Sequence, residues 1–519
     1  MQRANARHNI GSAAAVYLPI APLFYPPEAL YMKDFTPLKR AFAPLAFVLL
    51  ATTSGCYKLR GHYGGTQTFE PLARRVEATD VAVPAGYRVE AVAQGLTYPT
   101  GIAFDERGTP YVLEAGYSYG EVWTAPRLLR LEAGGRTSEV YVGGKNGPWT
   151  GVTYHDGAFY ISEGGQLEGG RILRVSPQGQ MSVVVDKLPS YGDHHTNMPV
   201  VGPDGYLYFG QGTATNSGVV GPDNADFGWL TRRRDFHDIP CQDITLTGEN
   251  FVSENPLTEA KEDKITTGAY VPFGTTTTKG QVVKGQLPCT GAIMRVPLRG
   301  GQPELVAWGL RNPFGLAYSP DGRLFTTENA YDTRGSRPGY GCGDVLWEIK
   351  PGAWYGFPDY SAGQPMNTSD YETPKNDPKF LLAKHPQQPP KPAAVLGVHS
   401  SSNGFDFSRA AAFGHVGEAF VAQFGDMAPE VGRVYGPVGY KVVRVNPATG
   451  AVEDFVVNKG RTNGPASEIS SAGLERPVAA RFDHSGKALY VVDFGVMPMT
   501  EQGPSPRKQT GVVWKITKE

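Results

Sequence analysis

Short runs of alternating apolar and polar residues recur along most of the chain. A small or polar pair opens each run, an Asp-x-x-Gly turn or a close variant follows it, and a second β-rich run comes next. Alternation with a period of two is the pattern of a half-buried strand, and the turn residues suit a tight connection between two strands. Six copies of this phrase occur, near Pro99, Thr150, Pro199, Pro313, Asn403 and Pro477.

A further set of strands, in which apolar and charged residues alternate, separates the six copies. These strands are expected at 127–131, 171–175, 292–296, 345–349, 441–445 and 512–516. A β-rich repeat with a period of about 50 residues indicates a propeller with four strands in each blade. The sequence therefore predicts an all-β, six-bladed β-propeller. A solenoid is the alternative, but it lacks large irregular insertions such as the long loop expected at about 220–290.

The two ends of the repeat region predict how the ring closes. The run 87–92 is β-rich, and the last strand is expected at 512–516. If these two segments share one blade, the sheets are left without exposed edges.

The N-terminal region has the pattern of a processing signal. Lys39-Arg40 precedes an apolar stretch, 41–51, which is too short to span a bilayer because a spanning helix needs about 20 apolar residues. Its length is that of a signal-peptide core. The Thr-Ser-Gly-Cys sequence that ends at Cys56 resembles the lipidation site of bacterial lipoproteins, with plain signal cleavage as the alternative.

These signals divide the chain into three expected parts. Residues 1–55 form a leader, 56–80 a linker and 81–519 the propeller. Met32-Lys33 would make a better translation start than Met1, which would leave residues 1–31 untranslated. We expect an exported protein at the periplasm or cell surface, attached to a membrane only through a lipid on Cys56.

Composition and charge narrow the functional classes. Gly (65) and Pro (43) are abundant, which favours many short strands joined by tight turns. The formal net charge is −1, and this argues against a nucleic-acid surface, because phosphate contacts need clustered Lys and Arg. The one basic run, Arg232-Arg233-Arg234, is interpreted as a solvated loop.

Three cysteines remain after Cys56. Cys241 and Cys289 bracket a polar, Thr- and Lys-rich stretch with little periodicity. An exported chain can form disulfides, and a bridge between these two would stabilise the insertion at its base by about 3–4 kcal/mol. The sequence contains no Cys-x-x-Cys-His, so covalently bound haem is not expected.

The segments that lead into the first strand of each copy are more polar than the strands that follow. In a propeller the first strand of each blade lines the central axis, so these segments gather at one rim. Histidine and arginine side chains that converge there predict a functional site. The segments are 98–100, 147–150, 193–197, 309–312, 399–403 and 474–476.

At this rim the chain resembles a known family, the soluble quinoprotein glucose/sorbosone dehydrogenases. These are six-bladed propellers that bind pyrroloquinoline quinone (PQQ) and calcium. The resemblance covers residues 85–519, and the segment 332–338 is closer to the sorbosone-type branch. It rests on the phrases at 188–194, 201–205, 309–316 and 344–358, which include Arg-Asn-Pro-Phe-Gly-Leu and Tyr-Gly-Phe-Pro.

The resemblance implies roles for individual residues. His194 would be the general base that takes a proton from a sugar hydroxyl while hydride passes to the quinone, and an imidazole suits that task near neutral pH. His399 is the alternative base. Ca²⁺ would act as a Lewis acid on the quinone. The cofactor contacts would come from Arg311, Asn312, Asn329 and Arg476, and calcium would take carbonyl oxygens of Ala330 and Tyr331.

The chain also departs from the family at three positions. Leu474 and Asp426 stand where the family supplies cations to the tricarboxylate cofactor, and Thr213 stands where it has the carboxylate that orients the base. Two other functions therefore stay open beside a PQQ-dependent dehydrogenase of a sugar, alcohol or aldehyde, which needs an external electron acceptor. One is a non-catalytic, surface-anchored binding propeller, and the other is a calcium-dependent, lactonase-like hydrolase.

Overall fold

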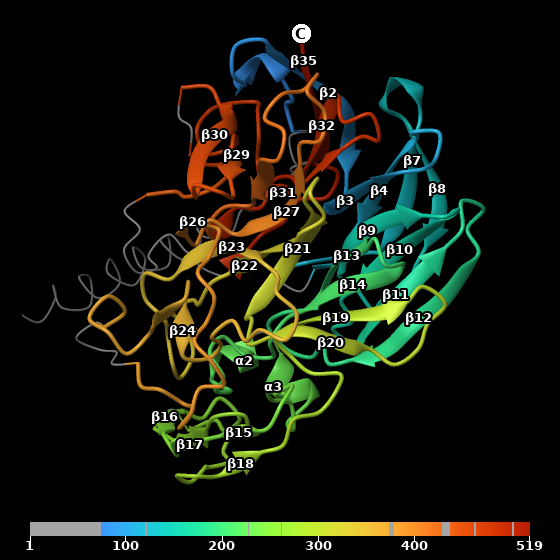
Figure 1. The fold of residues 1–519 in the computed structure, drawn as a ribbon. Coiled ribbons are helices and arrows are strands. Elements are labelled where there is room, and N and C mark those ends of the chain that lie inside the picture. Colours follow the sequence, from blue (N-terminus) through green and yellow to red (C-terminus); the bar gives the residue numbers. More distant parts are fainter. Residues whose placement is uncertain are drawn as a thin grey trace, which may run out of the picture. The chain divides into compact units, whose positions relative to one another are not determined.

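Six antiparallel sheets account for most of the regular structure in the computed structural model (Figure 1), which describes residues 74–519 except 120, 121, 227, 261, 373–377, 428–435, 461, 462, 501 and 502. The leader, Cys56 with its predicted lipid, and the linker up to residue 73 lie outside the described residues. In the described part, no helix has both the length and the apolar character needed to cross a membrane.

Each sheet is one blade, and its first strand lies nearest the common centre in Figure 1. Blade one contains β3 (Pro99–Phe104), β4 (Pro110–Glu114), β7 (Arg127–Leu131) and β8 (Thr137–Val142); blade two contains β9 (Trp149–His155), β10 (Ala158–Glu163), β11 (Gly170–Val175) and β12 (Met181–Leu188). Blade three contains β13 (Thr196–Val201), β14 (Tyr206–Gln211), β19 (Ala292–Pro297) and β20 (Glu304–Trp308); blade four contains β21 (Asn312–Tyr318), β22 (Leu324–Asn329), β23 (Gly343–Glu348) and β26 (Ala394–Val398).

The last two blades include the N-terminal strands. Blade five contains β27 (Ser402–Phe407), β28 (Ala419–Gln423), β29 (Lys441–Asn446), β30 (Ala451–Asn458) and β1 (Val81–Ala82); blade six contains β31 (Pro477–Phe482), β32 (Ala488–Asp493), β35 (Gly511–Lys518) and β2 (Tyr87–Leu96). The six repeat copies thus become the first two strands of the six blades, which confirms the predicted fold class. The charged strands between the copies are third strands, and a fourth strand covers each of them.

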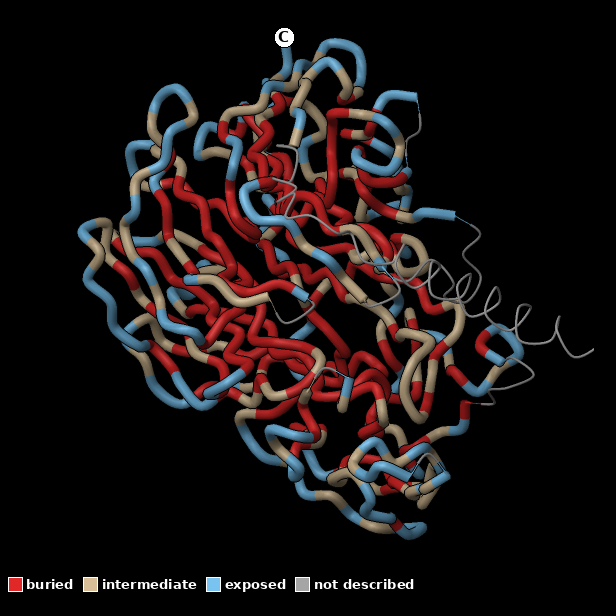
Figure 2. Tube along the Cα trace, turned by 180° about the vertical axis from the view of Figure 1, so that it is seen from behind, coloured by how far each residue is buried: buried red, intermediate tan, exposed pale blue. Residues whose placement is uncertain are grey.

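Burial follows the order of strands within a blade. The first strand β3 is buried along its whole length, whereas the outer strand β8 is intermediate or exposed throughout. Figure 2 shows the same trend around the ring, with buried inner strands and exposed outer turns. Inner strands also approach each other closely: a Cβ on Gly151 would lie 2.8 Å from Cα of Met198, and one on Gly404 would lie 2.9 Å from Cα of Ala479. Glycine at these positions lets neighbouring blades pack at the axis.

A buried acid or amide lies at or next to the end of the second strand in every blade. Five of the six accept a hydrogen bond from the segment that leads into the first strand of the same blade. Glu114, for example, accepts from the Thr97 backbone N–H at 2.7 Å, and Glu328 accepts from the backbone N–H of Arg311. The amide of Gln423 instead donates to Oγ of Ser402 at 3.2 Å. The six residues are Glu114, Glu163, Gln211, Glu328, Gln423 and Asp493.

The N-terminal segment closes the ring through two adjacent blades. β2 pairs with β35 from Tyr87↔Lys518 to Leu96↔Gly511, as the sequence predicts, and β1 pairs with β30. Arg74 adds a third contact: its Nη2 lies 2.6 Å from Oδ2 of Asp493, with the two side chains 4% and 0% exposed. Its guanidinium also donates to the carbonyls of Gly473 and Thr510.

Two long excursions leave the ring on the side of blades three and four. The first runs from 212 to 291 and contains α2 (Asp223–Asp226), α3 (Trp229–Arg232) and two ribbons, formed by β15 (Ile244–Thr245) with β18 (Val282–Val283) and by β16 (Asn250–Glu254) with β17 (Lys264–Gly268). The second runs from 349 to 393 and contains β24 (Tyr360–Ser361) and β25 (Gln364–Pro365). Short elements elsewhere are η1 (Ala78–Asp80), η2 (Ala133–Gly135), β5 (Tyr117–Ser118), β6 (Val122–Trp123), β33 (Met499–Thr500) and β34 (Gly503–Pro504).

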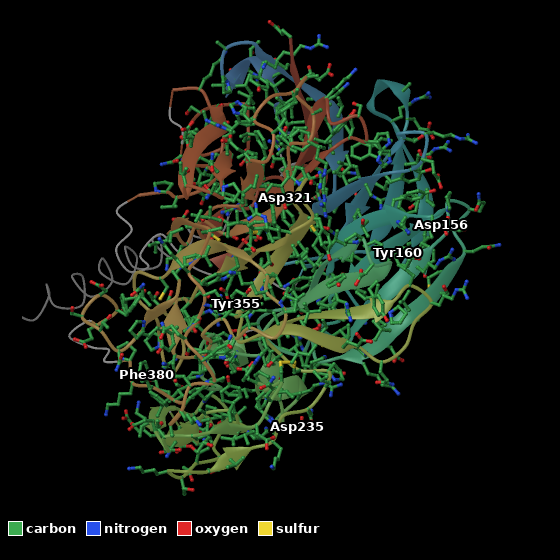
Figure 3. All side chains as sticks on the ribbon, in the orientation of Figure 1. Asp156, Tyr160, Asp235, Asp321, Tyr355 and Phe380 are labelled. Atoms are coloured by element: carbon green, nitrogen blue, oxygen red, sulfur yellow. A yellow bond between two sulfur atoms is a disulfide. The ribbon has the colours of Figure 1, made fainter. Side chains whose placement is uncertain are left out.

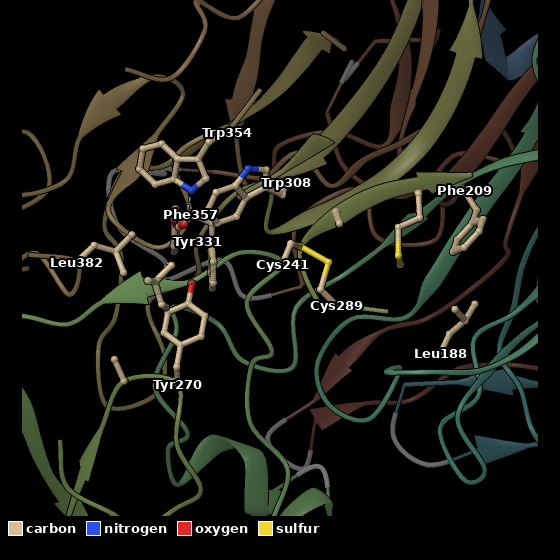
Figure 4. Close-up of a cluster of buried hydrophobic side chains, with 14 of the residues drawn as sticks. Leu188, Phe209, Cys241, Tyr270, Cys289, Trp308, Tyr331, Trp354, Phe357 and Leu382 are labelled. Carbon is tan, nitrogen blue, oxygen red and sulfur yellow. Dashed lines mark hydrogen bonds between the residues drawn. A yellow bond between two sulfur atoms is a disulfide. The ribbon is translucent and has the colours of Figure 1, made fainter. Parts of the chain in front are cut away.

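The two excursions pack on each other in one hydrophobic cluster. Leu246 and Leu382 form an isolated bridge, and both side chains are buried in this cluster. Figure 4 shows Leu382 together with Trp354. Cys241 and Cys289, the two cysteines paired in the sequence analysis, form a disulfide within this cluster. The second excursion has no counterpart in the sequence prediction, which expects one insertion only.

The ion pair that closes the ring generates a stability prediction. Arg74→Ala leaves the Asp493 carboxylate buried without its cation, and breaking a buried pair in this way costs about 3–5 kcal/mol. The free energy of unfolding, measured by denaturant titration, should fall by that amount. Arg75→Ala is the matched control because the Arg75 side chain is 76% exposed, and an equal loss in the two variants would contradict the prediction.

Candidate functional site

A cavity of about 350 Å³ lies at one end of the ring. Three of the six lead-in segments predicted to meet at the rim line it: those before blades three, four and five. The remaining walls come mainly from loops between the second and third strands, to which all six blades contribute. The lining residues used below are Tyr117, Tyr119, Gln166, Asp193, His194, Trp229, Arg311, Asn312, Asn329, Ala330, Asp332, Arg334, Asp344, His399, Asp426, Met427 and Met499.

Strand direction explains which loops build the cavity. Successive strands of a blade run antiparallel, so the segment before the first strand and the loop after the second strand lie at the same end. Those are the two kinds of segment found in the cavity wall. The hairpins between first and second strands, which carry the Asp-x-x-Gly turns, lie at the opposite end; Asp105 there accepts backbone N–H groups of its own turn.

His194 is held in one tautomer by Thr213. Nδ1 of His194 lies 3.0 Å from both the carbonyl oxygen and Oγ1 of Thr213. The Thr213 hydroxyl donates its own proton to the Thr215 carbonyl at 2.8 Å, so toward His194 it can only accept. A carbonyl and an accepting hydroxyl both require a proton on Nδ1. The lone pair of the imidazole is therefore on Nε2.

The charge state of His194 follows from its surroundings. Burial lowers its pKa well below the ordinary value, and the positive charges of Arg311 and Arg334 lower it further. The ring is 8% exposed and lines the cavity. At neutral pH this histidine is a neutral group whose Nε2 can accept a proton.

The two arginines of the cavity take part in an ion-pair network. Arg311 Nη2 lies 2.9 Å from Oδ2 of Asp332, and Arg334 Nη1 lies 2.7 Å from Asp193 and 2.6 Å from Asp223. Although burial raises the pKa of Asp332, Arg311 and Arg334 hold it well below the usual range. Asp332 is therefore ionised, and the network keeps both guanidinium groups at the cavity wall.

Sequence reasoning missed Asp332 and Arg334 as site residues. The segment 332–338 attracted notice only as a family feature, because the rim was sought in the segments before first strands. The alternating strand direction was the available signal: it places the loop after each second strand at the same rim.

The residues predicted to bind the cofactor separate into two groups. Arg311, Asn312 and Asn329 line the cavity, and the amide of Asn312 donates to Oδ1 of Asn329 at 2.9 Å. Arg476 does not line it. Its side chain lies between the rings of Phe424 and Tyr440, each 5.0 Å from the guanidinium carbon, and it donates to backbone carbonyls such as that of Met497.

The two residues predicted to offer carbonyls to calcium also differ. Ala330 lines the cavity. The Tyr331 side chain is 3% exposed, stacks on Phe357 and donates to the carbonyl of Tyr360. Within the described residues, no group of three or more His, Cys, Asp or Glu side chains is placed to hold a metal. A calcium ion here would need backbone or ligand oxygens in addition to any carboxylate of the cavity.

His399 and Asp426 present buried polar atoms without partners. Nδ1 of His399 lies 3.5 Å from Asp332, while its Nε2 has no hydrogen-bond partner in the described structure. Oδ1 of Asp426 accepts from the Tyr440 hydroxyl at 2.7 Å, and its Oδ2 has no such partner either. His399 also has a φ of 55°, which is a strained backbone conformation for a non-glycine residue. Unsatisfied atoms in a cavity wall are the groups that a ligand would satisfy.

The buried histidines predict how stability depends on pH. Burial lowers the pKa of His195, beside His194, to about 4. In the unfolded chain His195 is protonated below about pH 6.5, whereas in the folded chain it stays neutral down to about pH 4. The free energy of unfolding therefore falls as the pH decreases from about 6.5 to about 4. Each such histidine contributes about 1.4 kcal/mol per pH unit. In His195→Asn the slope of unfolding free energy against pH should be shallower by that amount, with the exposed His155→Asn as control; identical slopes would contradict the assignment.

Comparisons with known proteins identify similar structures only. No family model and no curated protein matches the sequence. An iodide structure of a Trichoderma reesei member of Carbohydrate-Active Enzymes Family AA12 is 16% identical, with a TM-score of 0.53 and coverage of 86% of this chain and 99% of that one. A calcium structure from the same family and organism is 17% identical, with a TM-score of 0.51 and coverage of 86% and 98%. The holo form of the pyranose dehydrogenase PQQ domain from Coprinopsis cinerea is 18% identical, with a TM-score of 0.50 and coverage of 86% and 99%. The chain therefore shares the fold of these proteins.

Proposed function

We propose that the protein is a PQQ-dependent oxidoreductase that oxidises a sugar or a related alcohol or aldehyde, with His194 as the general base. The observation that carries this proposal is the neutral imidazole of His194, whose Nδ1–H is held by Thr213 so that Nε2 can accept a proton in the cavity. The shared fold supports it, since one of the similar structures is a pyranose dehydrogenase PQQ domain in its holo form.

The cavity wall fits a flat, anionic cofactor. Arg311 and Arg334 offer guanidinium groups suited to carboxylates, and the amide of Asn312 lies beside them. Of the five N–H donors of Arg311, four are used in bonds to Asn216, Asn329 and Asp332, which leaves one N–H on Nη1. Aromatic and thioether side chains supply apolar walls: Tyr117, Tyr119, Trp229, Met427 and Met499.

The carboxylates of the cavity favour a divalent cation beside that cofactor. Asp193, Asp332, Asp344 and Asp426 line the cavity against two arginines. A tricarboxylate adds further negative charge, which Ca²⁺ would offset. Arg311, Arg334 and Asn312 would hold the quinone, and the carbonyl of Ala330 is the one predicted calcium ligand whose residue lines the cavity.

The residues of the chain account for the proton transfer in the reaction, as distinct from the hydride transfer. When a CH–OH group becomes C=O, the hydroxyl proton passes to Nε2 of His194 and the carbon loses a hydride, that is, one proton nucleus and two electrons. Bound PQQ would supply the acceptor for that hydride. The backbone and hydroxyl oxygens of Thr213 hold the ring in place, as the family carboxylate is expected to do, but without adding a negative charge.

Anion binding would also raise the pKa of the base, His194. Burial depresses the pKa of His194 most, and the positive charges of Arg311 and Arg334 depress it further. An anionic ligand on these arginines offsets their charge, so the pKa of His194 should rise toward neutrality, where a general base is most effective.

The first test combines binding and turnover. Metal-free protein is mixed with PQQ and excess Ca²⁺, binding is followed by absorbance, and reduction of a dye is assayed with a panel of aldoses and alcohols. His194→Gln should keep PQQ binding within about threefold and lower kcat by about 10²–10⁴-fold. Selective ¹⁵N-histidine spectra should show the pKa of His194 rising when PQQ binds. Turnover that survives in His194→Gln would exclude it as the base.

Asp426 gives a second test, in which the substitution should strengthen the binding of PQQ. Its carboxyl lies at the cavity wall where the family is expected to have a cation, so Asp426→Asn removes negative charge beside a tricarboxylate while the amide can still accept from Tyr440. The Kd for PQQ should fall about tenfold, which corresponds to about 1.4 kcal/mol. Asp483→Asn, in a turn at the opposite end of blade six, is the matched control.

The non-catalytic binding propeller has one observation in its favour. Arg476 is turned into the wall, and Leu474 and Asp426 stand where the family is expected to have cations, so three of the cations expected around PQQ are missing from the cavity. If PQQ fails to bind even in Asp426→Asn, this alternative takes the place of the dehydrogenase.

We also infer that the protein is exported and attached to a membrane by a lipid on Cys56. The leader pattern supports export, and the Cys241–Cys289 disulfide suits an oxidising compartment.

A further inference from the structure

Three consecutive arginines, Arg232, Arg233 and Arg234, lie on the outer side of the cavity wall. α3 begins with Trp229, which is 2% exposed and lines the cavity, and it ends at Arg232. In Figure 1 this helix lies between the ribbons of the first excursion and the blades, and Figure 3 labels Asp235, the residue that follows the arginines in the sequence. The sequence alone suggests that this basic run is a solvated loop. In the structure the run adjoins the candidate site.

A second hollow, of about 470 Å³, is formed by these arginines next to the cavity. Its lining consists of Gln166, Leu167, Trp229, Arg232, Arg233, Arg234 and Asp235. Gln166 and Trp229 line the cavity as well, so they separate the two spaces. We call this second space the basic hollow.

The basic hollow differs in charge from the cavity. It has three guanidinium groups against the single carboxylate of Asp235, whereas in the cavity four aspartates face two arginines. Arg233 is held over the ring of Tyr191, 3.5 Å from its centroid, and Arg232 lies 5.1 Å from the centroid of Trp229. Arg232 and Arg234 are exposed to solvent. A positive surface of this kind raises the local concentration of anions.

We propose that the basic hollow is the docking site of an anionic electron acceptor. This inference rests on the proposed function, which leaves two electrons in the cavity after each oxidation. With a one-electron acceptor such as ferricyanide, the balance is one CH–OH group and two ferricyanide ions giving one C=O group, two ferrocyanide ions and two protons. Docking at the basic hollow places the acceptor one side chain, Trp229, away from the cavity, and leaves the cavity open to substrate.

The surface itself can be tested without turnover. Ferrocyanide, the product of the probe reaction, is titrated by calorimetry into the full chain without PQQ or calcium. Binding should weaken at least tenfold between about 20 mM and about 300 mM salt. Arg232→Glu/Arg234→Glu should weaken it by at least about tenfold at low salt. Arg234→Glu alone should weaken it severalfold, and it serves if the double variant does not fold.

A matched control has the same change of charge at the far end of the ring. Arg107→Glu/Arg136→Glu replaces two exposed arginines in the hairpins after β3 and after β7, at the end opposite the cavity. This variant should bind ferrocyanide within about twofold of the wild type. Equal weakening in the two double variants would mean that net charge alone attracts the anion, and it would overturn the proposal.

Turnover distinguishes this inference from the proposed function. With PQQ, Ca²⁺ and a substrate, kcat/KM for ferricyanide should fall at least tenfold in Arg232→Glu/Arg234→Glu, while kcat/KM for the cationic hexaammineruthenium(III) should stay equal or rise. Equal losses with both acceptors would overturn the role in electron transfer. If no acceptor is reduced by the wild type, the proposed function fails, and with it this role for the hollow, whatever the calorimetry shows.

Discussion

A buried acceptor or donor at the end of the second strand holds each blade to its own lead-in segment. In water an acid or amide without a protein partner destabilises the fold little, because water takes the partner's place. In the interior an unpaired one lowers the free energy of unfolding by about 1–3 kcal/mol, so its partner has to stay in place. Glu328 illustrates the consequence: it accepts from the backbone N–H of Arg311 and from Nε1 of Trp347. The first of these residues lines the cavity and the second belongs to the core of the blade. The acid therefore links the rigid scaffold to a residue of the site.

Buried hydrogen bonds of this kind also fix the positions of the charged and polar side chains in the cavity. His194 is fixed by Thr213, which follows the buried Gln211 in the chain, and Asp344 accepts from the Ala330 N–H and from Ser400 and Ser402. Arg311 is bound on one side by Asn216 and on the other by Asp332. His194, Asp344 and Arg311 are thus each held by more than one hydrogen bond. The site is pre-organised by contacts within blades, such as that of His194 with Thr213, and by contacts between blades, such as that of Asp344 with Ser400.

Much of the fold could be predicted from the sequence, because a propeller repeats one pattern. The six copies, the pairing of the N-terminal run with the last strand and the pair Cys241–Cys289 all appear as regular features. The second excursion, at 349–393, could not be found in this way: its strands are two residues long, and its core residues such as Trp354 are buried against another excursion rather than in a periodic strand.

The candidate site was less predictable, for a physical reason. His194, Arg311 and Asn312 follow from position at the rim, but the sequence cannot show which way a rim side chain turns. Arg476 occupies a rim segment, yet it is drawn into the wall by Phe424, Tyr440 and several carbonyls. Asp332 and Arg334 come from a loop after a second strand, and their ion pairs with Arg311, Asp193 and Asp223 are tertiary contacts.

The pairing of β2 with β35 also has a consequence for biogenesis. β2 finds its partner only in β35, far along the chain, so the circle of blades stays open until β35 has been made. The ring is therefore completed by a pairing of very high sequence separation, which forms late in folding.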